Sequence, residues 1–85
     1  MEYIVISFRS RAHTVRFSDF LREHKIYGEI INTPKEAGVG CGLSVKCKKI
    51  YLPAVKKALS IVRLDSFAGI FSVMSVGGKR IVRSI

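Results

Sequence analysis

The chain has 85 residues, of which 48% are hydrophobic, and it carries 15 lysines and arginines against six aspartates and glutamates. A chain of this length forms one domain that buries about 60–65% of the surface exposed when unfolded. No apolar run approaches the roughly 20 residues that cross a bilayer, and the first residues lack the basic start and apolar stretch of a signal peptide. We therefore expect a cytoplasmic protein with no membrane segment.

The charge balance favours an anionic partner without identifying it. The formal net charge is +9, which is compatible with nucleic acid, an anionic membrane surface, an acidic protein or small oxyanions. The basic residues are scattered, with only short pairs such as Lys48-Lys49 and Lys56-Lys57. Nucleic-acid binding is therefore kept as an alternative function, with no specific patch assigned to it.

The two cysteines do not predict a disulfide scaffold or a metal site. Two thiols are too few for the disulfide framework of a small secreted domain, so both are expected to be reduced. Cys41 and Cys47 do not have the spacing of zinc ligands, and His13 and His24 lie far upstream. We expect no metal and no bound cofactor.

The first third of the chain predicts a strand, a helix and a second strand. Residues 2–8 are rich in β-branched and aromatic side chains, which favours a buried strand. Ser10 is suited to cap a helix that begins near Arg11. Gly28 ends this segment, and residues 29–32 predict a short strand. Five side chains share one face of the helix at helical spacing: His13, Phe17, Phe20, Leu21 and His24.

A glycine-rich loop, residues 33–42, joins this strand to the next. Residues 43–47 alternate apolar and polar side chains, and a period of two predicts a third strand. Leu43, Val45 and Cys47 then face the core, so Cys47 is interpreted as a small buried hydrophobic residue.

The rest of the chain predicts a second helix and a last strand. Residues 51–62 carry an apolar stripe at helical spacing. Residues 67–76 form the last apolar run, and Gly77-Gly78 breaks it. For the remaining residues, 79–85, three interpretations stay open: an added edge strand, part of a dimer contact, or a disordered tail.

This order of elements predicts an α+β fold. The simplest closed arrangement of a β-α-β-β-α-β chain is the ferredoxin-like split βαβ fold, with a four-stranded sheet and both helices on one face. We accordingly expect a single domain over residues 1–76, followed by a basic C-terminal tail, residues 77–85.

The predicted topology indicates which residues lie close to the glycine-rich loop. The loop between the second and third strands lies at the same end of the sheet as the turn entering the first helix and the turn leaving the second. Cys41 should therefore share that end with Ser10. It should also share it with four basic residues: Arg9, Arg11, Lys35 and Arg63.

Such surroundings would activate a thiol. A helix N-terminus and nearby cations lower a cysteine pKa from about 8.5 toward neutrality. Gly38, Gly40 and Gly42 would let backbone N–H groups approach an anion closely. The loop therefore predicts a reactive Cys41 thiolate, or an anion site beside it. The alternative is a loop whose glycines only supply positive φ, with an inert cysteine.

The motif residues resemble a known family. The chain is similar to short bacterial proteins of unknown function called selenium/sulfur-carrier-like proteins, over roughly residues 3–75. In that family Thr-Pro-Lys/Arg-Glu is followed by small residues and then by Cys-Gly-Leu-Ser/Ala. Ten positions here match the pattern: Phe8, Ser10, Thr33, Pro34, Lys35, Glu36, Cys41, Gly42, Leu43 and Ser44.

The resemblance implies that Cys41 carries sulfur or selenium as a persulfide or selenosulfide between donor and acceptor proteins. Such a protein is a carrier rather than a free-standing enzyme. The chain lacks the Cys-Pro-x-Pro motif of the better-understood sulfur-relay carriers, so their mechanism does not transfer intact. Two alternatives remain: a basic nucleic-acid- or anion-binding module, and a small structural or regulatory protein without chemistry that dimerises through its tail or an edge strand.

Overall fold

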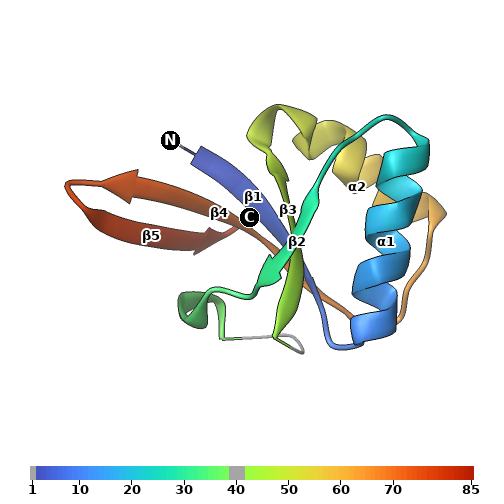
Figure 1. Ribbon diagram of the computed structural model, residues 1–85, viewed down its shortest axis with the longest axis horizontal. Coiled ribbons are helices and arrows are strands. Elements are labelled where there is room, and N and C mark those ends of the chain that lie inside the picture. Colours follow the sequence, from blue (N-terminus) through green and yellow to red (C-terminus); the bar gives the residue numbers. More distant parts are fainter. Residues whose placement is uncertain (1, 39–41) are drawn as a thin grey trace.

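The computed structural model describes residues 2–38 and 42–85, which form five strands, two α-helices and two short 3-10 turns (Figure 1). In chain order these are β1 (Glu2–Phe8), α1 (Arg11–Glu23), β2 (Glu29–Asn32), η1 (Lys35–Ala37), β3 (Leu43–Lys48), η2 (Lys49–Tyr51), α2 (Leu52–Ile61), β4 (Phe67–Val76) and β5 (Lys79–Ser84). Neither helix in this part of the chain is long and apolar enough to cross a membrane.

The strands form one sheet in the order β2-β3-β1-β4-β5, and every neighbouring pair is antiparallel. The predicted α+β class with two helices is confirmed. The predicted count of four strands is wrong, because residues 79–84 pair with β4 and add a fifth strand. The ferredoxin-like classification stays a prediction.

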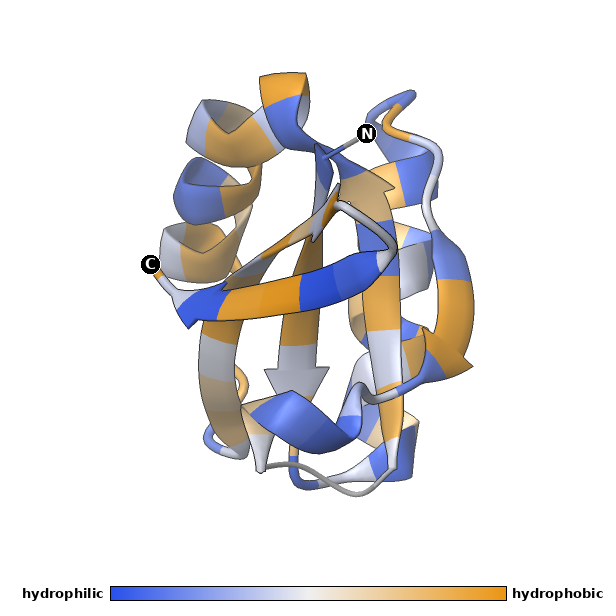
Figure 2. Cartoon of the chain, turned by 90° about the vertical axis from the view of Figure 1, so that its left-hand side faces the viewer, coloured by the Kyte–Doolittle hydropathy of each residue, from blue (hydrophilic) through white to orange (hydrophobic). Residues whose placement is uncertain are grey.

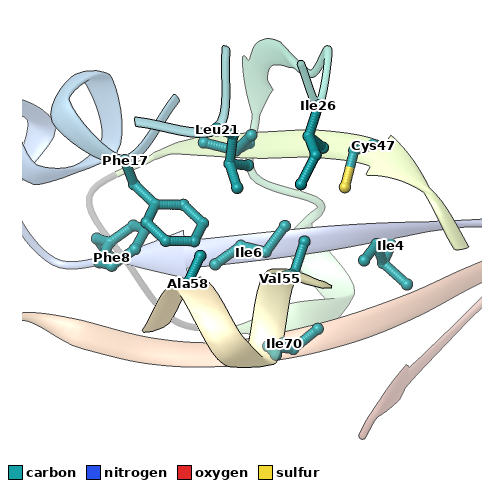
Figure 3. Close-up of a cluster of buried hydrophobic side chains, with 11 residues drawn as sticks. Ile4, Ile6, Phe8, Phe17, Leu21, Ile26, Cys47, Val55, Ala58 and Ile70 are labelled. Atoms are coloured by element: carbon teal, nitrogen blue, oxygen red, sulfur yellow. The ribbon is translucent and has the colours of Figure 1, made fainter. Parts of the chain in front are cut away.

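Both helices cover the same face of the sheet (Figure 1). Alternate residues of β1 point to opposite faces, and Ile4, Ile6 and Phe8 all point toward the helices and are fully buried (Figure 3). Phe17 of α1 packs on Phe8 with ring centroids 5.2 Å apart, and Val55 of α2 closes the cluster. Each of these large side chains contributes about 1.5–3 kcal/mol by leaving water.

The chain's last strand is an edge strand of the sheet and crosses part of the opposite face. Gly77 and Gly78, with φ of 56° and 77°, form the turn of the β4–β5 hairpin, and two consecutive positive φ angles match the right-handed twist of such hairpins. Figure 2 shows β5 crossing in front of the other strands. Val5, Phe71 and Val73 of this face are buried although no helix lies over them.

Candidate functional site

The candidate site is the end of the sheet where β2 leads into β3. The loop between them is closed at its base, because the Thr33 N–H donates to the Gly42 carbonyl over 2.8 Å. Between these residues Pro34 is buried, η1 forms one turn, and Gly38 ends that turn with a φ of 65°. A positive φ at Gly38, and one of 98° at Gly42, explains two of the glycines in the loop.

Two predicted site residues, Gly40 and Cys41, lie outside the described residues. Their participation in the site therefore stays a prediction. The two ends of the segment that contains them, Gly38 and Gly42, are both exposed at this end of the sheet.

Ser66, which sequence reasoning missed, ties the turn before α1 to the turn before β4. Its carbonyl accepts from the Arg9 N–H at 2.8 Å, and its hydroxyl accepts from the Ser10 N–H at 3.2 Å. The same hydroxyl lies 2.6 Å from His13 Nδ1. Ser10 caps α1 as predicted, because its hydroxyl accepts from the His13 N–H.

The beginning of α1 also contacts the strand that leaves the loop. The Thr14 hydroxyl donates to the Ser10 carbonyl at 3.2 Å and shares this proton with the Leu43 carbonyl at 3.4 Å. The turn before α1, the turn before β4 and the start of β3 are therefore held together at one end of the sheet.

The four basic residues predicted for this end are all exposed: Arg9, Arg11, Lys35 and Arg63. In residues 2–38 and 42–85, none of them forms an ion pair within 4.0 Å. Arg63 lines an open groove of about 830 Å³ between α1 and the end of α2, together with Arg16 and Asp65. These cations are free to interact with an anion in solution.

A chain of three hydroxyls lies beneath the loop and was not predicted. The Ser44 hydroxyl lies 2.7 Å from that of Thr33 and 2.8 Å from that of Ser7. Ser7 and Ser44 are fully buried and are paired across β1 and β3, on the face of the sheet opposite the helices. Ser7, a polar residue within the apolar strand 2–8, was the one sequence feature that pointed to a buried hydrogen bond. A single hydroxyl does not indicate which residue it bonds to.

The loop is also held from the far end of the chain. Arg80 of β5 donates two hydrogen bonds to the Glu36 carboxylate of η1, from Nη2 at 2.8 Å and from Nε at 3.1 Å. Figure 1 shows β5 and η1 side by side. This forked contact holds the pKa of Glu36 below its usual value. A motif residue and the tail are thus joined, and nothing in the local sequence of either indicates it.

Cys47 does not have the properties of the reactive thiol that is predicted for the site. Its side chain is 5% exposed and belongs to the main core, as predicted (Figure 3). Burial raises the pKa of its thiol to about 11, so it is protonated at neutral pH. Within the described part of the chain no three His, Cys, Asp or Glu side chains come together to hold a metal ion.

Residues 3–65 match the model of a protein family described as "Putative Se/S carrier protein-like". The chain belongs to this family. The match runs from β1 through α2 and includes the whole motif loop, whereas β4 and β5 lie beyond it. Comparisons with curated proteins and with solved structures found no match.

Proposed function

We propose that this protein carries sulfur or selenium on Cys41, as a persulfide or selenosulfide, between a donor and an acceptor protein. Membership of the carrier-like family supports the proposal most directly. The structure of the loop also supports the proposal. Two exposed glycines, Gly38 and Gly42, flank the segment that contains Cys41, and a hydrogen bond fixes the base of the loop. Cys47, being buried and protonated, does not compete for the cargo.

The transfer needs no oxidant or metal. The Cys41 thiolate attacks the terminal sulfur of a donor persulfide, a new S–S bond forms to Cys41, and the donor's S–S bond breaks. The donor leaves as a thiolate, and the carried sulfur keeps its oxidation state. The reverse reaction with an acceptor thiolate delivers the sulfur. The exposed cations Lys35, Arg9 and Arg11 would favour the thiolate and the persulfide anion.

The nucleic-acid alternative receives less support from the fold. Single-stranded RNA is usually bound by stacking bases on exposed aromatic residues of an open sheet face. Here β5 crosses that face, Phe71 is buried, and the Tyr3 ring already has the Lys46 ammonium 4.4 Å from its centroid.

Mass spectrometry of the loaded protein tests the carrier function. The protein is incubated with a cysteine desulfurase and cysteine, or with selenide and an oxidised thiol, and its intact mass is measured. We expect wild type and the matched control Cys47→Ala to gain one sulfur or selenium atom, and Cys41→Ala to gain none. Equal loading of Cys41→Ala, or no loading of folded wild type by either donor, would show that the proposal is wrong.

A further inference from the structure

We propose that the turn η2 and the outer face of α2 dock on the surface of an anionic lipid bilayer. The docking face consists of three apolar residues and four lysines, all of them exposed: Ile50, Pro53, Ala54, Lys48, Lys49, Lys56 and Lys57. This face does not include the motif loop, and its binding does not depend on the cargo chemistry of Cys41.

The docking face lies in a stretch of the chain that has no acidic residue. All six aspartates and glutamates of the protein lie outside residues 37–64, whereas six lysines and arginines lie inside this range. Lys49 is bonded to Glu2, with 2.9 Å between Nζ and Oε2. Within residues 2–38 and 42–85, the other three lysines of the face have no ion pair within 4.0 Å. The face therefore keeps a net positive charge that an anionic surface would neutralise.

An isoleucine lies among these charges. Ile50 is 80% exposed, more than any other large hydrophobic side chain that the structure describes. Pro53 and Ala54 are exposed one turn further along the chain, so the apolar surface continues onto α2. An exposed apolar surface with charged residues around it is typical of a site that contacts another protein or a membrane.

The outer face of α2 differs in composition from that of α1. Five of the thirteen residues of α1 are charged, and they include both signs. Two of the ten residues of α2 are charged, and both are lysines. A surface helix ordinarily presents charged and polar residues to water, as α1 does. Apolar residues combined with lysines on an outer face are instead typical of a helix that lies at a membrane interface.

Lipid matches this face better than nucleic acid or an acidic protein does. All cations of the face are lysines, although the chain contains seven arginines. Arginine forms the forked hydrogen bonds that recognise an individual phosphate or carboxylate, whereas lysine acts as a point charge. A lipid headgroup layer offers diffuse negative charge, and the hydrocarbon beneath it accommodates Ile50. A nucleic-acid backbone has no apolar counterpart for that side chain, and a second copy of the chain would bring like charges together.

The docking face lies at the end of the sheet opposite to the motif loop. β3 begins at Leu43 beside that loop and ends at Lys48, and η2 follows directly. Figure 1 shows η2 and η1 at opposite ends of the sheet. A protein bound through η2 and the start of α2 would therefore present η1 and the start of β3 away from the bilayer.

Sedimentation with lipid vesicles tests the docking face. The full chain is mixed at low salt with vesicles of phosphatidylglycerol and phosphatidylcholine in equal parts, or of phosphatidylcholine alone. We expect wild type to bind the anionic vesicles, and to bind the neutral vesicles at least about tenfold more weakly. Added salt should release it, because exposed charges are screened. The Cys41→Ala variant should bind equally, which separates this result from the outcome of the loading experiment.

Two variants remove the charged and the apolar parts of the face separately. Each lysine near an anionic surface contributes about fivefold in affinity, so Lys56→Gln/Lys57→Gln should bind at least about tenfold more weakly. Ile50→Ser should lose about tenfold, since the isoleucine side chain leaves water on binding. All three side chains are exposed, so these variants should remain folded. The matched control Lys79→Gln/Arg83→Gln removes two exposed cations of β5 and should bind as wild type does.

NMR locates the bound surface independently of the variants. Anionic bicelles that contain a spin-labelled lipid are added to the ¹⁵N-labelled protein. We expect the amide signals of Lys49, Ile50 and Lys57 to broaden more than those of Thr33 and Gly42, which lie at the other end of β3.

Four results would overturn the proposal: equal binding to neutral vesicles, a loss in the β5 control as large as in Lys56→Gln/Lys57→Gln, strongest broadening at Thr33 or Gly42, or no sedimentation of folded wild type with anionic vesicles at low salt. Binding of duplex DNA or polyglutamate through the same lysines, without binding of vesicles, would assign the face to a nucleic acid or an acidic protein instead.

Discussion

The hydroxyl of Ser44 lies between those of Ser7 and Thr33, and both serines are fully buried. Ser44→Ala leaves the buried Ser7 hydroxyl without the partner at 2.8 Å, and takes a partner from Thr33. Leaving a buried polar group unpaired costs about 1–3 kcal/mol. We expect the free energy of unfolding, measured in urea, to fall by that amount.

A double variant separates the energy of the hydrogen bond from the energy lost when a buried oxygen atom is removed. Ser7→Ala/Ser44→Ala removes both polar groups, so its loss should be smaller than the sum of the two single losses. Ser60→Ala is the control, because its hydroxyl is exposed and bonds to the Lys57 carbonyl of its own helix. Strictly additive losses for Ser7 and Ser44 would contradict the hydroxyl chain.

Cys47 should make folding stability depend on alkaline pH. Its folded-state pKa of about 11 lies above the usual value, so the protonated thiol contributes stability that is complete below about pH 8.5 and is lost as pH rises through 11. We expect the urea midpoint to fall between pH 8 and pH 10.5 by more in wild type than in Cys47→Ala. An equal fall in both proteins would mean that the thiol ionises freely when folded.

The residue scale also shows what sequence can and cannot predict. The alternation over residues 43–47 correctly placed Val45 and Cys47 in the core, because a period of two is a local property of the strand. The same alternation predicts that the Ser44 side chain points away from the core, and such a side chain is usually exposed to solvent. Ser44 is buried instead, with its hydroxyl against those of Ser7 in the neighbouring strand and Thr33, the residue that opens the loop.

At the scale of elements, the contact between β5 and η1 should be sensitive to acid. The pKa of Glu36 is lowered mainly by its hydrogen bonds to Arg80. A lowered carboxylate pKa contributes stability present above the unfolded-state value and lost as pH falls through the folded-state value. In Arg80→Gln the Glu36 pKa should therefore rise toward its usual value, as measured by NMR titration of the carboxylate.

Lys35→Gln is the control for that titration. Lys35 lowers the Glu36 pKa only through its charge and less than Arg80 does, so its removal should move the Glu36 pKa less than Arg80→Gln does. A larger shift in Lys35→Gln would mean that β5 does not hold the motif turn.

The elements themselves were largely predictable, whereas their contacts were not. Residues 29–32 and 67–76 form strands over the predicted ranges, because strand propensity and the flanking glycines act locally. The pairing of residues 79–84 with β4 was only one of three interpretations, since a short basic segment after Gly77-Gly78 is compatible with each. The Arg80–Glu36 contact spans 44 residues, a separation that no local pattern encodes.

At the scale of the whole molecule, the tail completes a second buried layer. The family match ends at residue 65, yet Val5 and Val73 are fully buried and Phe71 nearly so, on the face that the β4–β5 hairpin closes (Figure 2). Deleting residues 77–85 should expose these side chains. Since each fully exposed side chain of this size costs about 1.5–3 kcal/mol, the loss approaches the roughly 5–15 kcal/mol that keeps a domain folded.

We therefore expect the shortened chain to unfold at a much lower urea concentration than wild type, or to remain partly folded and bind a hydrophobic dye. Removal of Ile85 alone is the control, because it takes away one hydrogen bond to Ile70 and leaves Arg80 and Val82 in place. If the deletion of 77–85 left the urea midpoint unchanged and bound no dye, the helix-free face would be stable by itself. The tail would then serve to hold the motif loop through Arg80 rather than to complete the core. If the midpoint falls as expected, one strand does both: it closes the helix-free face of the core, and through Arg80 it holds the turn η1 that opens the motif loop.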